Sequence, residues 1–215
     1  MKTPTSKYIL WAEFLLVFGG FPLLILAMKN RGLMIATLWV GALIVWGVLK
    51  WGYKRAHAAE WNWAGLHAGL KHVLLRFAVL APLIALLTWF FIPESFLSLP
   101  RERPELWVRI MFLYPLLSVW PQEIIYRSFI YHRYGPLWGN ARGYIAASTL
   151  SFGFMHVMFL NPVAVIMTAL GGFLFASDFA RHKSLGLACC EHALYGCLIF
   201  TIGLGRFFYS GAAWI

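Results

Sequence analysis

Long apolar stretches separated by short polar ones run along most of this chain. A helix that spans the hydrocarbon core of a bilayer needs about 20 predominantly apolar residues, with a range of roughly 17–25. Seven stretches come close enough to this length to matter, and they cover approximately Tyr8–Met28, Leu33–Lys50, Val73–Ile92, Leu106–Phe129, Tyr144–Leu160, Val163–Ala180 and Leu185–Leu204. The pattern predicts an all-α fold, a polytopic transmembrane helical bundle of about seven spans.

The polar stretch between Lys50 and Lys71 differs from the other loops in its aromatic content. Tryptophan and tyrosine are interleaved there with lysine and arginine, at Trp51, Tyr53, Trp61 and Trp63. Aromatic and basic side chains in this mixture are typical of helices that lie at the level of the lipid headgroups. We therefore expect one interfacial helix in addition to the spans.

The high hydrophobic content and the distribution of charge are those of a membrane protein, and they favour lipid over nucleic acid as a partner. Of the 215 residues, 61% are hydrophobic and 12% are charged, whereas a soluble domain is about 45–50% apolar and about 25% charged. The net charge of +10 comes from basic residues in the loops, and more of them lie on the side that a cytoplasmic N-terminus would place inside. We expect contact with membrane lipid, no nucleic-acid partner, and a multi-pass protein of the bacterial plasma membrane with a cytoplasmic N-terminus. Neither a repeat nor a linker is present, so residues 1–215 are predicted to form a single integral membrane domain.

Five of the ionisable residues inside the apolar stretches lie in the segments PQEIIYR, FGFMH and EHALYG: Glu123, Arg127, His156, Glu191 and His192. A charged side chain at the centre of a membrane helix costs roughly 2.5–3.5 kcal/mol on insertion scales, and such residues usually mark functional sites. Each has a structural explanation when taken alone. Glu123 and Arg127 are four residues apart and can form an ion pair on one helix face, and a single histidine can be a packing residue. Three such sites on three segments favour chemistry or transport.

The order of three motifs resembles the CPBP intramembrane protease family, which includes the type 2 CAAX prenyl proteases and the Abi proteins. The family motifs are Glu-Glu-x-x-x-Arg, Phe-x-x-x-His and His-x-x-x-Asn, each on a membrane helix. This chain has QEIIYR at 122–127, FGFMH at 152–156 and HALYG at 192–196. The resemblance covers approximately residues 106–205, which we expect to be the catalytic half of the domain.

The resemblance implies hydrolysis of peptide bonds inside the membrane. In the family, a glutamate of the first motif and the histidine of the second activate a water molecule. The last motif supports the oxyanion, and the arginine holds the site together. Carried to this chain, these roles fall on Glu123, Arg127, His156 and His192.

Two positions depart from the family pattern. Gln122 stands at the first glutamate of the motif and cannot accept a proton from water. Glu123 lies about 100° further around the helix, so it cannot simply replace that residue. Glu191, the neighbour of His192, is an alternative base. Gly196 replaces the asparagine and removes a side-chain donor, which the hydroxyl of Tyr195 could supply.

The sequence indicates no cofactor. One glutamate and two histidines could bind zinc, but no His-Glu-x-x-His motif is present, so we prefer a metal-independent site. The three cysteines, Cys189, Cys190 and Cys197, have no metal-type spacing and are predicted to be reduced core residues.

Three functions are compatible with these observations. The first is an intramembrane endopeptidase that cleaves membrane-associated or lipid-modified peptides with a water activated by glutamate and histidine. The second is a catalytically inactive scaffold or binding protein, which the changes at Gln122 and Gly196 favour. The third is a small proton-coupled transporter, in which the buried groups form a proton relay.

Overall fold

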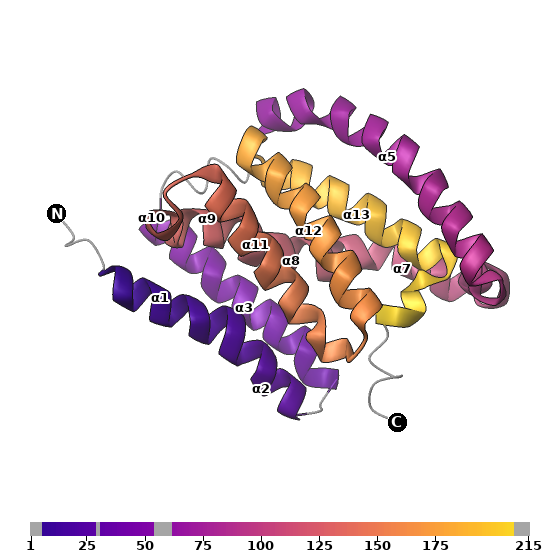
Figure 1. The fold of residues 1–215 in the computed structure, drawn as a ribbon, viewed down its shortest axis with the longest axis horizontal. Helices are drawn as coiled ribbons and strands as arrows, with labels where there is room; N and C mark the ends of the chain where they lie inside the picture. The colour runs from indigo at the N-terminus through magenta and orange to yellow at the C-terminus, as the bar shows by residue number, and fades with distance from the viewer. Residues whose placement is uncertain (1–5, 29–30, 54–61, 209–215) are drawn as a thin grey trace.

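The computed structural model describes residues 6–28, 31–53 and 62–208 (Figure 1). Within these ranges every regular element is helical and no strand is present. This confirms the predicted all-α membrane bundle.

The first half of the chain forms three long helical segments. Helix α1 (Lys7–Leu15) continues without a break through the π-helical turn η1 (Leu16–Gly20) into α2 (Phe21–Met28). Helix α3 (Arg31–Gly52) follows, and then α5 (Trp63–Phe91). A short connection, η2 (Pro93–Ser95) and α6 (Ser98–Glu102), leads into the second half.

The second half begins with one continuous helical run that contains two π-helical segments. It consists of α7 (Pro104–Tyr114), η3 (Pro115–Val119), α8 (Trp120–Glu123), η4 (Ile124–Phe129) and α9 (Ile130–Arg133). A π-helical turn widens the helix locally, and such turns occur frequently at functional sites. The first of them, η3, ends just before the first motif at 122–127, and the second, η4, contains the last four residues of that motif.

The remaining elements complete the bundle. They are α10 (Gly135–Trp138), α11 (Ala141–Met155), the 3-10 turn η5 (His156–Phe159), α12 (Pro162–His182), α13 (Leu185–Ile202) and the 3-10 turn η6 (Leu204–Phe208). The fifth predicted segment is therefore broken at His156, where the α-helix ends.

Four of these helices begin at a side chain that caps the free backbone N–H groups. Asn62 accepts a hydrogen bond from Gly65, and corresponding bonds are made by Asn140, Asn161 and Ser184 at the start of α11, α12 and α13. Asn and Ser are preferred at this position because a side-chain oxygen satisfies one of the otherwise unpaired N–H groups.

Five helical segments are long and apolar enough to cross a membrane: Lys7–Met28, Met34–Gly52, Trp63–Phe91, Pro162–His182 and Leu185–Ile202. The segments that begin at Pro104 and Ala141 are also helical. The first contains several charged residues, and the second is shorter than the five spans above. The number of seven spans stays a prediction.

The predicted interfacial helix is replaced in part by α5. Residues 54–61 lie outside the described ranges, but Trp63 already belongs to α5, which continues without interruption to Phe91. The segment from Trp63 to Lys71, expected to be interfacial, thus forms the first turns of a long helix. The capping bond of Asn62 explains why this helix begins before the apolar stretch does.

Helices α11, α12 and α13 lie side by side, and α5 curves along the outer side of α13 (Figure 1). Helices α1, α2 and α3 lie on the opposite side of the bundle. Only three residues of α5, Gly69, Val73 and Thr88, are buried. The second half of α5, with η1, α3, α7 and α13, therefore borders a space inside the bundle rather than packing against a solid core.

Candidate functional site

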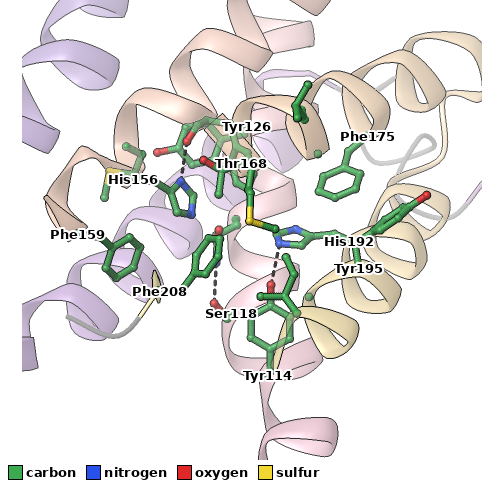
Figure 2. Close-up of a pocket in the computed structure, with 18 of the residues that line it drawn as sticks. Tyr114, Ser118, Tyr126, His156, Phe159, Thr168, Phe175, His192, Tyr195 and Phe208 are labelled. Atoms are coloured by element: carbon green, nitrogen blue, oxygen red, sulfur yellow. Dashed lines mark hydrogen bonds between the residues drawn. The ribbon is translucent and has the colours of Figure 1, made fainter. Parts of the chain in front are cut away.

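A large cavity in the bundle contains both motif histidines. Its volume is about 960 Å³, and its walls are mainly apolar side chains from almost every long helix. His156 and His192 extend into it, and Ser118, Gln122 and Tyr114 add polar groups to the wall (Figure 2). The cavity is therefore an apolar chamber with a small polar region on one side.

Glu123 lies behind this wall rather than in the cavity. Its carboxylate accepts hydrogen bonds from Arg127, from Nε to Oε2 at 2.9 Å and from Nη2 to Oε1 at 3.3 Å. Both side chains are 0% exposed. The third nitrogen of Arg127, Nη1, donates to Ser148 Oγ at 2.6 Å, and Ser148 donates in turn to the carbonyl oxygen of Tyr126 at 2.7 Å. The predicted pair is present, and the buried charges have the additional hydrogen bonds that such a pair needs.

His192 joins this pair to the cavity. Its Nδ1 lies 2.8 Å from Glu123 Oε1, and its Nε2 lies 2.9 Å from the hydroxyl of Tyr114. A carboxylate accepts only, so Nδ1 carries the hydrogen and donates it to Glu123. Nε2 of the neutral ring then accepts from the phenol. The ring is held further by stacking on Phe175, with centroids 4.8 Å apart and an angle of 19°.

His156 has a different environment. Its Nδ1 lies 2.7 Å from the carbonyl oxygen of Phe152, the residue one turn earlier. A carbonyl oxygen accepts only, so Nδ1 is again the protonated nitrogen and Nε2 keeps a free lone pair. No carboxylate of the described residues forms a hydrogen bond or ion pair with this imidazole. Among the described residues, His156 and Glu123 therefore form no direct hydrogen bond or ion pair.

Phe152 brings the three motifs together. Its ring lies 4.8 Å from the ring of His156 and 5.5 Å from that of His192, both edge-on. The guanidinium carbon of Arg127 lies 4.7 Å from the centre of the same ring, in the range of a cation–π contact. The phenylalanine of the second motif is thus a common packing surface for the ionisable groups of all three motifs.

Gln122 occupies the place on the cavity wall where the family has a glutamate. Its Nε2 donates to Ser118 Oγ at 2.6 Å, and both residues border the cavity. Successive residues of a helix point about 100° apart, so Gln122 faces the cavity while Glu123 faces the interior of the bundle. No Asp or Glu is found among the described residues that line the cavity.

Tyr114 is a site residue that the sequence motifs do not reveal. It belongs to the last turn of α7, is 78 residues away from His192, and lies outside all three motifs. Its ring contacts those of His192 and Phe200, at centroid distances of 6.0 and 5.3 Å. A hint of its position is that it precedes Gln122 by eight residues, about two helical turns, on the same helical run.

Glu191 does not meet the other candidate residues. Its Oε1 forms an ion pair with Arg76 of α5, which also binds Asp178 of α12, and the side chain of Glu191 is 0% exposed. It does not line the cavity. The structure therefore does not support Glu191 as an alternative base beside His192, because its carboxylate is paired with Arg76 outside the cavity.

The hydroxyl of Tyr195 is also directed elsewhere. Its ring borders the cavity, but the hydroxyl points away from it (Figure 2). The electrostatic partners of this hydroxyl are Arg76, Asp178 and Glu191. It does not reach His192, so it does not replace the donor that is missing at Gly196.

No group of three or more His, Cys, Asp or Glu residues with a geometry suited to a metal ion is found in the part of the chain that the structure describes. Glu123 and His192 are in contact, but both carboxylate oxygens of Glu123 already bind Arg127. The three cysteines are free thiols.

Comparison with known proteins supports the order of the motifs. Residues 104–198 match a family model described as type II CAAX prenyl endopeptidase Rce1-like. This segment contains all three motifs and also Tyr114. No curated protein and no solved structure matches the chain significantly.

Proposed function

Since residues 104–198 match a family model described as type II CAAX prenyl endopeptidase Rce1-like, we propose that this integral membrane protein is an intramembrane endopeptidase. Its substrates are membrane-associated or lipid-modified peptides. The observation that carries the proposal is that His156 presents an unprotonated Nε2 to a large apolar cavity that also contains His192.

In this proposal His156 is the general base. Its Nδ1 is fixed by the carbonyl oxygen of Phe152 at 2.7 Å, so Nε2 is free to accept a proton from water. Gln122 and Ser118 also line the cavity, and in this proposal their amide and hydroxyl hold that water. General base catalysis of this kind contributes about 10²–10⁴ in rate.

The reaction proceeds by addition and elimination. As His156 takes the proton, the water oxygen bonds to the peptide carbonyl carbon and the carbonyl oxygen becomes an oxyanion. The carbon–nitrogen bond then breaks, and the proton passes from His156 to the leaving amine. The products are a new carboxyl terminus and a new amino terminus.

Glu123 acts through His192 rather than on water. The carboxylate is paired with Arg127 and fixes the orientation and tautomer of His192 with the 2.8 Å bond to Nδ1. This is the role of a carboxylate that orients an imidazole, as in other hydrolytic sites. The glutamate-activated water expected from the family pattern is therefore replaced in this proposal by a water activated at His156.

The cavity supports an apolar substrate. With a volume of about 960 Å³ and mainly aliphatic and aromatic walls, it lies at the upper end of the usual range for small-molecule sites, about 300–1,000 Å³. A hydrocarbon chain or an apolar peptide segment fits this chemistry. A strongly charged peptide does not.

We further propose that the protein resides in the bacterial plasma membrane with a cytoplasmic N-terminus. The excess of basic residues in the loops on that side supports this orientation.

The proposal is tested with the full chain in liposomes. A farnesylated peptide, the same peptide with a palmitoyl chain, and the unmodified peptide are incubated with the protein, and products are identified by mass spectrometry. We expect cleavage of a lipidated peptide by the wild type and none by the double variant H156A/H192A. Absence of any cleavage by a folded wild-type protein would overturn the proposal.

A second function is favoured by one specific observation. No acidic residue of the described chain lines the cavity, because Gln122 replaces the glutamate there. A protein that binds a lipidated segment without cleaving it needs the apolar chamber but not a base. In the same assay this function predicts retention of the intact lipidated peptide by both the wild type and H156A/H192A.

A further inference from the structure

Gly196 and Tyr114 fit together in a way that no motif specifies. A Cβ atom placed on Gly196 would lie 2.3 Å from Cε1, 2.4 Å from Oη and 2.6 Å from Cζ of Tyr114. Cβ atoms do not approach other heavy atoms this closely. The ring of Tyr114 therefore occupies the volume that any side chain at position 196 would fill.

Position 196 is where the resemblance expects an asparagine, one helical turn after His192 on the same face of α13. A side-chain amide at that point would project beside the imidazole toward the cavity. In this chain the phenol of Tyr114 enters the same volume from α7 and places a hydroxyl 2.9 Å from His192 Nε2. The amide donor expected at position 196 of α13 is absent, and the hydroxyl of Tyr114 on α7 is present in the same place.

The surroundings of Tyr114 fix its hydroxyl as a donor. Glu123 pairs with Arg127 and accepts the hydrogen of His192 Nδ1, and in the neutral ring Nε2 accepts from the phenol. Edge-to-face contact with Phe200, at a centroid distance of 5.3 Å, supports the ring from the other side. The hydroxyl hydrogen is free to rotate about the C–O bond, while the oxygen stays in place on the cavity wall.

We propose that Tyr114, admitted by Gly196, is the catalytic donor that stabilises the developing oxyanion in place of the asparagine. This inference rests on the proposed endopeptidase activity. As the carbonyl oxygen gains negative charge, the phenol hydrogen turns from His192 Nε2 to that oxygen. No covalent bond of the protein is broken, and Tyr114 returns to His192 when the carbon–nitrogen bond breaks.

Three variants test the role of the hydroxyl in the cleavage assay. Y114F keeps the ring and removes the donor, so we expect kcat to fall by about 10²–10³, the usual effect of losing one oxyanion donor, with little change in KM. Y8F is the control for the exchange of tyrosine for phenylalanine, because Tyr8 is exposed on α1 and does not line the cavity, and its kcat should equal that of the wild type. G196N retains Tyr114 and should unfold at a lower temperature because of the clash.

An exchange of the two residues tests the shared volume. Y114A removes both ring and donor, and Y114A/G196N restores the asparagine of the family into the space that the ring has left. We expect the double variant to be more active than Y114A and more stable than G196N. Equal kcat values for Y114F and the wild type would overturn the inference. So would a double variant that is no more active than Y114A or no more stable than G196N.

A binding experiment separates this inference from the proposed activity. An alkyl-bearing dipeptide phosphinate mimics the tetrahedral oxyanion, and its Kd can be measured whether or not the protein cleaves peptides. We expect Y114F to raise this Kd at least tenfold and Y8F to leave it unchanged. If the wild type cleaves nothing but shows this pattern, the proposed activity fails and the anion site stands. If the phosphinate does not bind, or binds Y114F and the wild type equally, the assignment of Tyr114 fails.

Discussion

Nδ1 of His192 donates a hydrogen bond to Oε1 of Glu123, 2.8 Å away, and this bond connects α13 to α8. It gives Glu123 a different role from that of a free catalytic base. Both oxygens of the carboxylate are occupied by Arg127, and the side chain is 0% exposed. The residue holds an imidazole in one orientation and leaves the chemistry to groups on the cavity wall.

The first prediction concerns the stability of this buried group. E123Q keeps the shape of the side chain but leaves Arg127 with an uncompensated charge inside the bundle. We expect the free energy of unfolding in detergent micelles to fall by about 3–5 kcal/mol, as for other buried pairs that lose one partner. Thermal unfolding followed by tryptophan fluorescence measures the change.

The double variant E123Q/R127M provides the control, because it removes both charges. It should be more stable than E123Q alone, since neither charge of the Glu123–Arg127 pair is left buried without its partner. If E123Q unfolds at the same temperature as the wild type, the ion pair does not carry the structural role assigned to it.

The second prediction concerns Gln122. Because this side chain faces the cavity and Glu123 does not, Q122E introduces a carboxylate where the family motif has one. We expect faster hydrolysis of a lipidated peptide, by up to the factor of about 10²–10⁴ that a positioned acid–base group contributes.

Q122A is the matched control, since it removes the amide without adding a base. Its rate should fall below that of the wild type because the water loses a hydrogen-bond partner. A Q122E protein that folds normally and cleaves no faster than the wild type would show that position 122 does not reach the reacting water.

The third prediction separates Glu191 from the reaction. Glu191 of α13 and Asp178 of α12 share Arg76 of α5, and none of the three lines the cavity. E191Q should therefore retain at least half of the wild-type cleavage rate, while R76M, which leaves two carboxylates without their cation, should lower the unfolding temperature strongly. Loss of cleavage in an E191Q protein with an unchanged unfolding temperature would restore Glu191 as a base.

The fourth prediction concerns metal ions. A base at His156 requires no bound metal, so preincubation with a strong chelator should leave the cleavage rate unchanged. Metal content of the purified protein is measured in parallel by mass spectrometry. Loss of activity on chelation, with recovery on adding Zn²⁺, would assign the site to zinc.

The helices follow from the sequence to a large extent. Apolar length predicts seven helical segments, because backbone groups in a bilayer must be satisfied within the segment. The boundaries are less predictable. Helix α5 begins at Trp63 because Asn62 caps it, and this local bond extends the helix through a stretch whose composition suggests the membrane surface.

The site is predictable where one helix contains both partners. Glu123 and Arg127 are four residues apart, and their ion pair follows from helical geometry alone. The same geometry separates Gln122 from Glu123 and, equally, Glu191 from His192, since neighbours in a helix face different sides. It does not say which member of a pair faces the cavity, since the adjacent residues Tyr195 and Gly196 of α13 both line it, so the position of Glu191 depends on how α13 packs.

The contact between Tyr114 and His192 could not be predicted in this way. The two residues are 78 positions apart, and their contact depends on how α7 packs against α13. In the sequence this contact is reflected in the glycine at position 196, which leaves room for the ring of Tyr114.

The most direct test of the account is the rate of peptide hydrolysis by H156A compared with that of the wild type, on the lipidated peptide that the wild type cleaves fastest. The two proteins should unfold at similar temperatures, because His156 bonds only to the backbone of its own helix and borders the cavity. We predict a fall in kcat of about 10²–10⁴, the contribution of a general base. An H156A protein that cleaves at the wild-type rate would contradict the assignment of His156 as the base.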